Sequence, residues 1–478
     1  MVRLITAVSL SFWLTACALY TPQAVVPGST LPQENAAQWI APLPHNGTLT
    51  DLSQWWMQHG DPLLVTLIES AQAVSPSIAS AKTRIEQARA TRVIAGAALL
   101  PRLDASASGS HSSAQPPVIP VNTSLQAGLQ PSWELDLFGA NRASRNSAQA
   151  RYEGAQAAWH DARVSLAADV ANLYYSLRAC EKVWAVSRAD AASRAETSRL
   201  TALTAEAGFA APATAALARA SAAEASNRVT RQRAQCDLDV KALVALTAVD
   251  EPTLRQKLID TPASLSPDVG ISIASVPARV LAQRPDIFNA GREQVAASFD
   301  VGGAEALRYP RLTLSGSVGV SRFSSGGMTT DLNTWSVGPI SLTVPLFDGG
   351  RSAANLEAVR VRYEEASAKY RSAVRNAVRE VEEALVNLQS TGARNADAAT
   401  ALEGYQASFN GTKRRYQEGL ASLVELEDAR RTWLAAEIAL VSLQQERMAA
   451  WVSLYRAAGG GWTPGRAAPA ASAIPAAF

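Results

Sequence analysis

The chain carries the same order of segments twice. Leu100-Pro101-Arg102-Leu103 returns as Tyr309-Pro310-Arg311-Leu312, and the two prolines are 310 − 101 = 209 residues apart. Leu137-Phe138-Gly139 returns at the same offset as Leu346-Phe347-Asp348-Gly349. In each copy, short alternating segments precede a long alanine-rich stretch, a glycine and a second long stretch. A repeat of this size indicates one structural unit used twice, which overrides the length-based expectation of about three domains.

The N-terminus has the pattern of a bacterial lipoprotein signal. The apolar run from Leu4 to Trp13 is too short to span a bilayer. Leu14-Thr15-Ala16-Cys17 follows and resembles a lipobox, where the peptide is cut before a cysteine that receives a diacylglycerol. We expect a signal peptide at 1–16 and lipidation of Cys17; the alternative is an ordinary secretory signal with an incidental cysteine. Ala18, in place of aspartate, resembles lipoproteins sorted to the outer membrane.

The two remaining cysteines are placed symmetrically. Their midpoint is (180 + 236)/2 = 208, and Gly208 is the predicted turn of a helical hairpin. At about 1.5 Å per residue, each lies roughly 42 Å along its helix from that turn. The periplasm is oxidising, so we predict a Cys180–Cys236 disulfide. Two buried free thiols at matching heights are the alternative, because spacing alone does not fix which way a side chain faces.

Four segments alternate with period two and are predicted as strands: 103–112, 125–137, 311–323 and 333–346. Large apolar residues occupy one face of each segment, and serine, threonine and glutamine occupy the other. The parity of the fourth segment changes near Pro339, which predicts a β-bulge there. The connecting loops are expected at 111–124 and 324–333.

An apolar face opposite a small polar face has two interpretations. It is either the inner face of a soluble sandwich or the lipid-facing side of a transmembrane barrel with a polar lumen. The lipobox-like signal and the lack of further strands favour the barrel. The smallest membrane barrels need about eight strands, so at least two chains must share one, and three chains would supply 3 × 4 = 12.

The long stretches are predicted as helices at 61–100, 140–206, 212–246, 275–307, 350–417 and 422–456. Apolar residues recur in them at helical spacing, and a helix of roughly 67 residues is about 100 Å long, which suits a span across the periplasm. The predicted organisation is an extended strap at 17–60, repeats at 61–268 and 269–458, and a tail at 459–478.

Two motifs resemble those of the TolC-like outer-membrane efflux factors, in particular their lipidated OprM/NodT branch. One runs from Val276 to Ile287 and contains Arg284-Pro285-Asp286-Ile287; the other is Trp133-Glu134-Leu135-Asp136-Leu137-Phe138-Gly139. The resemblance covers residues 17–460. It implies a homotrimer in which a 12-stranded outer-membrane β-barrel continues into a 12-helix periplasmic α-barrel with a mixed equatorial domain.

The resemblance also implies the function. Such proteins are passive exit ducts for drugs or other small toxic compounds, and they act with a periplasmic adaptor protein and an inner-membrane transporter, commonly of the proton-driven RND type. The duct of a type I protein secretion system is the alternative. A lipid-anchored coiled-coil scaffold without a pore is a further rival.

The segment after Gly419 carries the residues expected at the periplasmic aperture. Glu425 and Asp428 are three residues apart on one helix face, and three chains would bring 3 × 2 = 6 carboxylates together. The resemblance implies that they form acidic rings that favour cations, and repulsion within a ring would raise their pKa values. The alternative is that acids early in a helix complement its dipole.

Closure and docking residues are also implied by the resemblance. Tyr416 occupies a position used in the closing lock, and Thr214 stands where an acidic partner often occurs, so Thr214 would accept a weaker hydrogen bond. A packed interface aromatic is the alternative for Tyr416. The adaptor-docking tips are expected at Gly208, Phe209, Gly419, Leu420 and Ser422.

The composition gives little support to other classes. The net charge is +2, so nothing argues for a nucleic acid partner. The four histidines, His45, His59, His111 and His160, have no metal-ligand spacing, and no nucleophile-elbow or phosphate-loop motif is present. We therefore expect no enzymatic activity, no metal and no cofactor.

Overall fold

The computed structural model describes residues 40–41, 55–58, 60–113, 121–261, 265 and 280–463. The predicted signal peptide and Cys17 lie outside the described residues, as do most of the strap at 17–60, the Val276–Arg279 part of the first motif and the tail beyond residue 463. The chain forms two compact units. The first contains Lys82–Ala157 and Phe288–Ala373, and the second contains Ala158–Ile287 and Val374–Phe478 with residues 31–81.

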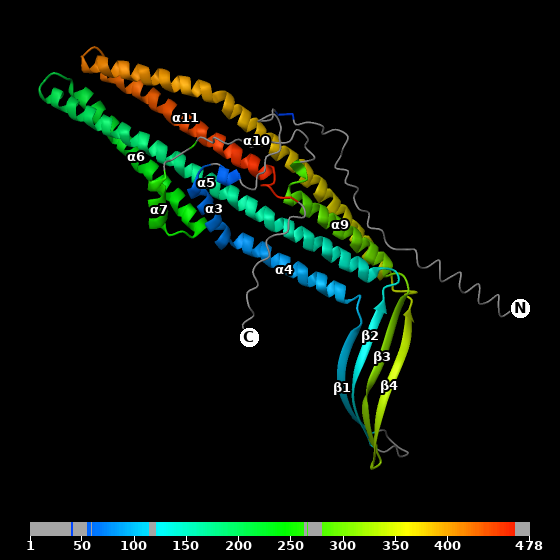
Figure 1. The fold of residues 1–478 in the computed structure, drawn as a ribbon. Coiled ribbons are helices and arrows are strands. Elements are labelled where there is room, and N and C mark those ends of the chain that lie inside the picture. The colour runs from blue at the N-terminus through cyan, green and yellow to red at the C-terminus, as the bar shows by residue number, and fades with distance from the viewer. Residues whose placement is uncertain are drawn as a thin grey trace. The chain divides into compact units, whose positions relative to one another are not determined.

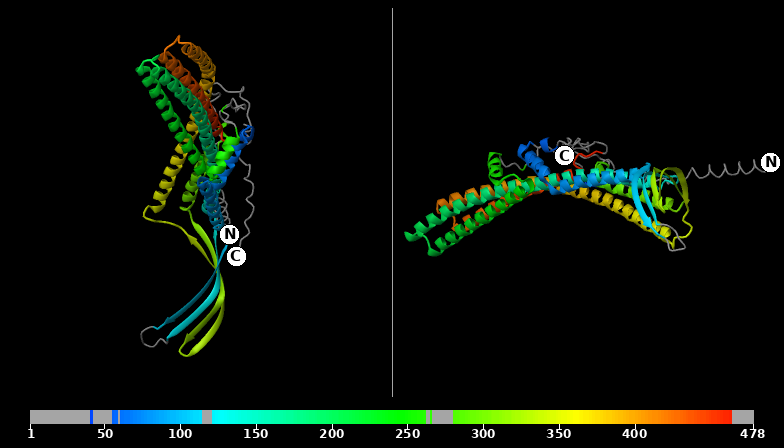
Figure 2. Two further views of the ribbon diagram at one scale, coloured as in Figure 1. Left: turned by 90° about the vertical axis from the view of Figure 1, so that its left-hand side faces the viewer. Right: turned by 90° about the horizontal axis from the view of Figure 1, so that it is seen from below.

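The first unit contains a four-stranded antiparallel sheet in the order β1-β2-β3-β4, coloured from cyan to yellow in Figure 1. The strands are β1 (Arg102–Ser112), β2 (Asn122–Leu135), β3 (Arg311–Ser325) and β4 (Met328–Thr343). The pairing of β2 with β3 joins the two copies of the repeat in the middle of the sheet. The sheet is long, curved and twisted (Figure 2).

The register assigns the two faces of the sheet. Ala105, Leu129, Val318 and Trp335 stand side by side in one row across the strands, and the next row along is Ser106, Gly128, Gly319 and Thr334. Successive residues of a strand point to opposite faces. One face is therefore apolar and the other polar, as the sequence pattern predicts.

The predicted bulge is confirmed. Leu314 pairs with Ile340, whereas Gly316 pairs with Val337, so two residues of β3 span the same distance as three of β4. The additional residue falls at Gly338-Pro339, where the proline has no N–H to give to the ladder.

The predicted loop at 324–333 is wrong. The strands continue to Ser325 and resume at Met328, so only Gly326-Gly327 connects them. The φ angles of these glycines are 58° and 86°, and positive φ at both central residues is the requirement of the tightest hairpin turns. The glycine- and threonine-rich composition was typical of a loop, but the two-residue turn keeps these residues paired.

The described helices are α2 (Trp55–Gln58), α3 (Pro62–Val74), α4 (Pro76–Ala97), α5 (Ala140–Glu206), α6 (Pro212–Thr247), α7 (Glu251–Asp260), α9 (Pro285–Ala306), α10 (Arg351–Gln417) and α11 (Leu423–Ala457). The predicted helix at 61–100 is interrupted, because Ser75 precedes a proline and is extended at ψ 122°. The predicted helix at 275–307 is interrupted at 282–284, after which α9 begins at Pro285, and its predicted start at residue 275 lies outside the described residues. Within the described residues no single helix is long and apolar enough to cross a membrane. The pair α3 and α4, bent by 50° where they meet, reaches that length and apolar composition only when the two helices are taken together.

The two 67-residue helices, α5 and α10, are each preceded by an aspartate that accepts N–H groups at the start of the helix. Asp136 accepts the N–H groups of Asn141 and Arg142 at 3.0 and 2.9 Å. Asp348 accepts those of Gly350 and Ser352 at 3.0 and 2.9 Å. These bonds satisfy N–H groups that have no partner within the helix. In both copies of the repeat, an aspartate between the last strand and the 67-residue helix therefore caps that helix.

The Arg-Pro-Asp segment has a structural role in the second unit. Arg284 is buried, donates to Asp286 at 3.0 and 2.7 Å, and donates to Glu380 on α10 at 2.7 Å. It also donates to the carbonyl oxygen of Ala457 at the end of α11, at 3.1 Å. A buried guanidinium needs such partners. Arg284 thus ties the start of α9 to two helices of the second repeat.

Candidate aperture and docking tips

The two helical hairpins of the second unit end in matching turns. Gly208 has φ +79° and Gly419 has φ +78°. The following N–H reaches back five residues in each turn, from Phe209 to the Thr204 oxygen at 2.8 Å and from Leu420 to the Arg415 oxygen at 2.7 Å. This is the Schellman arrangement, which requires a left-handed residue and so favours glycine.

Both turns present a large apolar side chain to solvent. Phe209 is 88% exposed and Leu420 is 66% exposed. The turns lie at the same end of the second unit (Figure 1). The predicted tip residues therefore occupy two similar, exposed ends. Docking of an adaptor there remains a prediction.

Glu425 caps its own helix. Its carboxylate accepts the N–H of Ser422 at 2.7 Å, and the Ser422 hydroxyl accepts the N–H of Glu425 at 3.2 Å, which completes a capping box at the start of α11. These hydrogen bonds lower the pKa of Glu425. Within one chain the direction is opposite to the increase expected from repulsion between acids, because the ionised carboxylate is the better acceptor.

Asp428 lies one turn further along α11 and forms an ion pair with Arg431. Both side chains are exposed, at 63% and 77%. Arg415 approaches Glu425 to 3.8 Å. Each candidate aperture acid therefore has a basic neighbour, so the charge at this point is smaller than the carboxylates alone would give. The lumen ring remains a prediction.

The partner of Tyr416 differs from the predicted one. Its hydroxyl lies 3.3 Å from that of Thr201 on α5, whereas the structure records a hydrogen bond of Thr214 only from its N–H, to the Ala211 oxygen at 2.9 Å. Tyr416 also packs against a cluster that contains Phe409. The expected contact between Tyr416 and Thr214 on α6 is therefore replaced by a contact with Thr201 on α5. Thr201 is buried.

A buried ionic cluster near the tips was not predicted. Asp190 and Arg194 on α5 meet Glu427 and Arg430 on α11, and the side chains of Asp190 and Arg430 are each only 2% exposed. Arg194 donates to Asp190 at 3.0 Å and forms an ion pair with Glu427. Arg430 donates to Glu427 at 2.7 Å. Two acids and two bases are thus paired where α5 meets α11.

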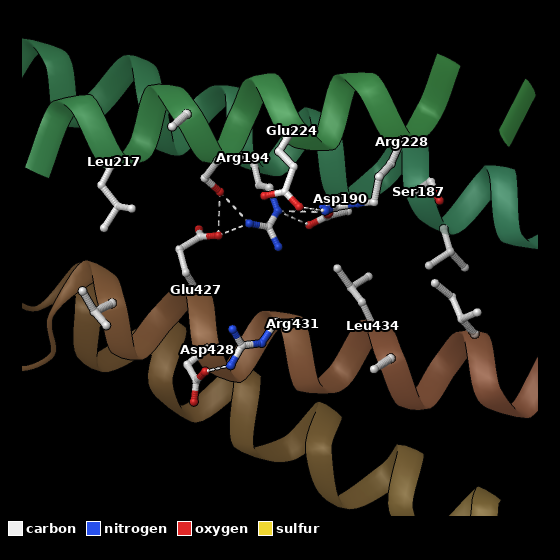
Figure 3. Close-up of a pocket in the computed structure, with 16 residues that line it drawn as sticks. Ser187, Asp190, Arg194, Leu217, Glu224, Arg228, Glu427, Asp428, Arg431 and Leu434 are labelled. Carbon is white, nitrogen blue, oxygen red and sulfur yellow. Dashed lines mark hydrogen bonds and ion pairs between the residues drawn. The ribbon is translucent and has the colours of Figure 1, made fainter. Parts of the chain in front are cut away.

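The cluster extends to α6, as Figure 3 shows. Ser221 donates to Glu427 at 2.8 Å, and Arg228 donates to Asp190 at 3.2 Å. The side chains border a groove of about 520 Å³ between α6 and α11. Burial lowers the pKa of Arg430, and Glu427 acts in the opposite direction. The cluster fixes α11, which carries the candidate aperture acids, to both helices of the first hairpin.

Only part of this cluster was visible in the sequence. Asp190 and Arg194 are four residues apart, and Glu427 and Arg430 are three apart, so each pair suggested a local ion pair on a helix surface. Nothing in the sequence shows that these surfaces face each other. The sequence signal for the cluster was limited to these two charge spacings and to the small residues of the hairpin helices, which allow close packing.

The structure joins Cys180 to Cys236. Their sulfur atoms lie 2.11 Å apart and their Cα atoms 5.6 Å apart, which is bonding geometry. The bond links α5 to α6, as the symmetric spacing predicts. Among the described residues, no group of three or more histidine, cysteine or acidic side chains is arranged to hold a metal ion.

Comparison with known proteins identifies the family. The model described as outer membrane efflux protein matches twice, over residues 67–249 and 276–460. The second match begins 276 − 67 = 209 residues after the first. This is the offset of the sequence repeat, so the duplication is confirmed.

Individual proteins align over most of the chain. SrpC, the solvent efflux pump outer membrane protein of Pseudomonas putida, is 29% identical over 84% of this chain and 86% of its own. OpmQ, the pyoverdine export outer membrane protein of Pseudomonas aeruginosa, is 30% identical over 97% and 98%. The solved outer-membrane channel OprN superposes with a TM-score of 0.79 at 27% identity, covering 90% of this chain and 98% of OprN. The resemblance stated from the motifs is confirmed, and this chain belongs to the outer membrane efflux protein family.

Proposed function

We propose that three copies of this chain form the passive exit duct of a tripartite efflux pump, anchored in the outer membrane and extending into the periplasm. The open sheet carries this proposal. Its edge strands β1 and β4 each pair on one side only, and four strands are about half of the smallest membrane barrel. Pairing β1 of one copy with β4 of the next would satisfy both edges.

The two faces of the sheet support the same arrangement. Leu129, Val318 and Trp335 share the apolar face and are 43%, 53% and 75% exposed in one chain. Such a surface needs an apolar environment. In a closed barrel it would contact lipid, and the serine- and glutamine-rich face would line a water-filled lumen.

The helical hairpins supply the periplasmic part of the proposed duct. Their tips, at Gly208-Phe209 and Gly419-Leu420, would meet a periplasmic adaptor, which links the duct to an inner-membrane transporter of the RND type. Lipidation of Cys17 would add a second membrane attachment. The solvent and pyoverdine named for SrpC and OpmQ favour small compounds as the cargo class.

Two measurements test the proposal. The mass of the detergent-solubilised protein should correspond to three chains, and the protein should produce stepwise currents in planar bilayers. In cells, deletion should raise the accumulation of small apolar compounds only when the partner transporter is present. A monomer without conductance contradicts the duct.

A further inference from the structure

Near the turn that connects β3 and β4, these two strands change the polarity of their faces, whereas β2 keeps Leu125 on the apolar face and Ser124 on the polar face. As far as Val320 and Ser321 on β3, one face is apolar and the other polar. Leu332 stands on the polar face opposite Ser321, and closer to the turn Arg322 and Asp331 stand on the apolar face and Phe323 on the polar face. Within the first unit, the turn between β3 and β4 lies at the end of these strands that is far from the end of α9 and the start of α10 (Figure 1).

The register establishes this exchange. Val320 pairs with Ala127 and Asn333, and the next row on the same face contains Leu125, Arg322 and Asp331. Residues two apart on a strand share a face. The register shift of β3 and β4 lies between Leu314 and Gly316, at the other end of the pairing. The exchange is therefore a property of the side chains and not of a slipped strand.

The charged pair marks a boundary on the apolar face. Arg322 donates to Asp331 through Nε at 2.7 Å and through Nη2 at 2.9 Å. Both side chains are well exposed, at 60% and 66%. A charged group on the lipid-facing side of a barrel is disfavoured most at the bilayer midplane and least at its interface. This row therefore fits the outer edge of the lipid-facing band.

The apolar pair stands at the same height on the opposite face. Phe323 pairs with Ser124 and Thr330, and Leu332 pairs with Ser321. Phe323 and Leu332 are diagonal neighbours, close enough for large side chains to touch. Phe323 is 42% exposed and Leu332 is 51% exposed. Two large apolar side chains thus project from a face that is otherwise rich in serine and glutamine.

We propose that Phe323 and Leu332 of three copies form an apolar ring at the outer mouth of the duct, which restricts ions and favours apolar solutes. This proposal rests on the proposed trimeric duct with its polar face toward the lumen. Hydrophobic constrictions limit ion flow because water leaves them readily. An apolar solute loses less hydration on passing them than an ion does. The outer mouth would then favour apolar solutes, whereas the acidic tip at Glu425 and Asp428 would favour cations.

The first test is conductance in planar bilayers. The double variant Phe323→Ser with Leu332→Ser should raise single-channel conductance at least about twofold. Leu125→Ser is the matched control, because it makes the same kind of change at nearly the same height on the opposite face, and its conductance should equal that of the native protein. Equal conductance in the double variant, or an equal rise in the control, overturns the ring. Absence of current in the native protein instead contradicts the duct itself.

The second test places a charge in the ring. Phe323→Cys should carry about twofold more current after a negatively charged methanethiosulfonate reagent is added to the outer side, because a hydrated charge opposes the loss of water from the ring. Leu125→Cys should label without a change in current. Cys180 and Cys236 are joined to each other and offer no competing thiol. Labelling of Phe323→Cys with no change in current places this residue outside the conducting path and overturns the proposal.

Discussion

Arg194 on α5 and Glu427 on α11 form a largely buried ion pair between residues 233 positions apart. Their side chains are 8% and 16% exposed. The pair links the hairpin of the first repeat to that of the second, close to both tips. The candidate aperture acids lie on the same helix as Glu427, so this contact determines where α11 holds them.

Glu427→Ala is expected to destabilise the second unit. Removing one member of a buried pair leaves the other charge unpaired, which costs about 3–5 kcal/mol. Thermal unfolding followed by circular dichroism measures the effect. Glu446→Ala is the control, because its pair with Arg394 is 53–55% exposed and such pairs contribute about 0–1 kcal/mol. Equal losses in the two variants contradict a special role for the buried cluster.

The acidic tip is predicted to make the channel cation-selective. Glu425→Gln with Asp428→Asn removes the two charges, while glutamine preserves the capping box with Ser422. The reversal potential across a salt gradient should move toward zero. Glu446→Gln serves as the control for loss of an exposed acid elsewhere on α11. An unchanged reversal potential in the double variant argues against a lumen position for these acids.

The close approach of β2 and β3 at Gly128 and Gly319 predicts intolerance to side chains. A Cβ at Gly319 would lie 2.4 Å from the Ala127 oxygen and 2.8 Å from the Gly128 Cα. Gly319→Ala should therefore reduce the fraction of protein that assembles into an oligomer, measured by the gel migration of unheated against heated samples. Gly404→Ala is the control, since nothing lies within 4 Å of its Cβ position in α10 and alanine favours a helix by about 1 kcal/mol.

The bond between Cys180 and Cys236 should be present in the native protein and should stabilise it. Titration of unfolded, unreduced protein should find both thiols blocked. Replacing both by serine should cost about 4 kcal/mol, because the bond closes a loop of 56 residues in the unfolded chain. Two free thiols in the titration, or unchanged unfolding of the double variant, contradict this prediction.

His160 should make stability sensitive to acid. Burial, with a smaller contribution from Arg163, lowers its pKa from 6.5 to about 4. Between these values the unfolded chain binds a proton that the folded chain does not, so stability is complete above pH 6.5 and falls as the pH drops toward 4. His160→Gln should flatten this part of the profile of unfolding temperature against pH, and His111→Gln on the exposed strand β1 should not. Identical profiles for His160→Gln and the native protein contradict the assignment.

The sequence by itself determined the duplication, the four strands and the long helices, and it favoured the pairing of Cys180 with Cys236. These features depend on periods of two and 3.6 residues and on simple offsets, which are local properties of a chain. The capping box of α11 is also a local pattern in the sequence, because Ser422 and Glu425 are three residues apart and form its hydrogen bonds with each other. The break at Ser75 had a local signal in the following proline, which the continuous apolar pattern obscured.

The tertiary structure decided which surfaces meet. Tyr416 contacts Thr201, 215 residues away, and not Thr214, because the contact face of a helix depends on the neighbour packed against it. The cluster around Glu427 arises for the same reason. The β3–β4 strands extend to Gly326-Gly327 because pairing between Arg322 and Asp331 and their neighbours outweighs the loop-like composition. Contacts between distant segments set these features, and their free energies are not encoded in the periodicity of either segment alone.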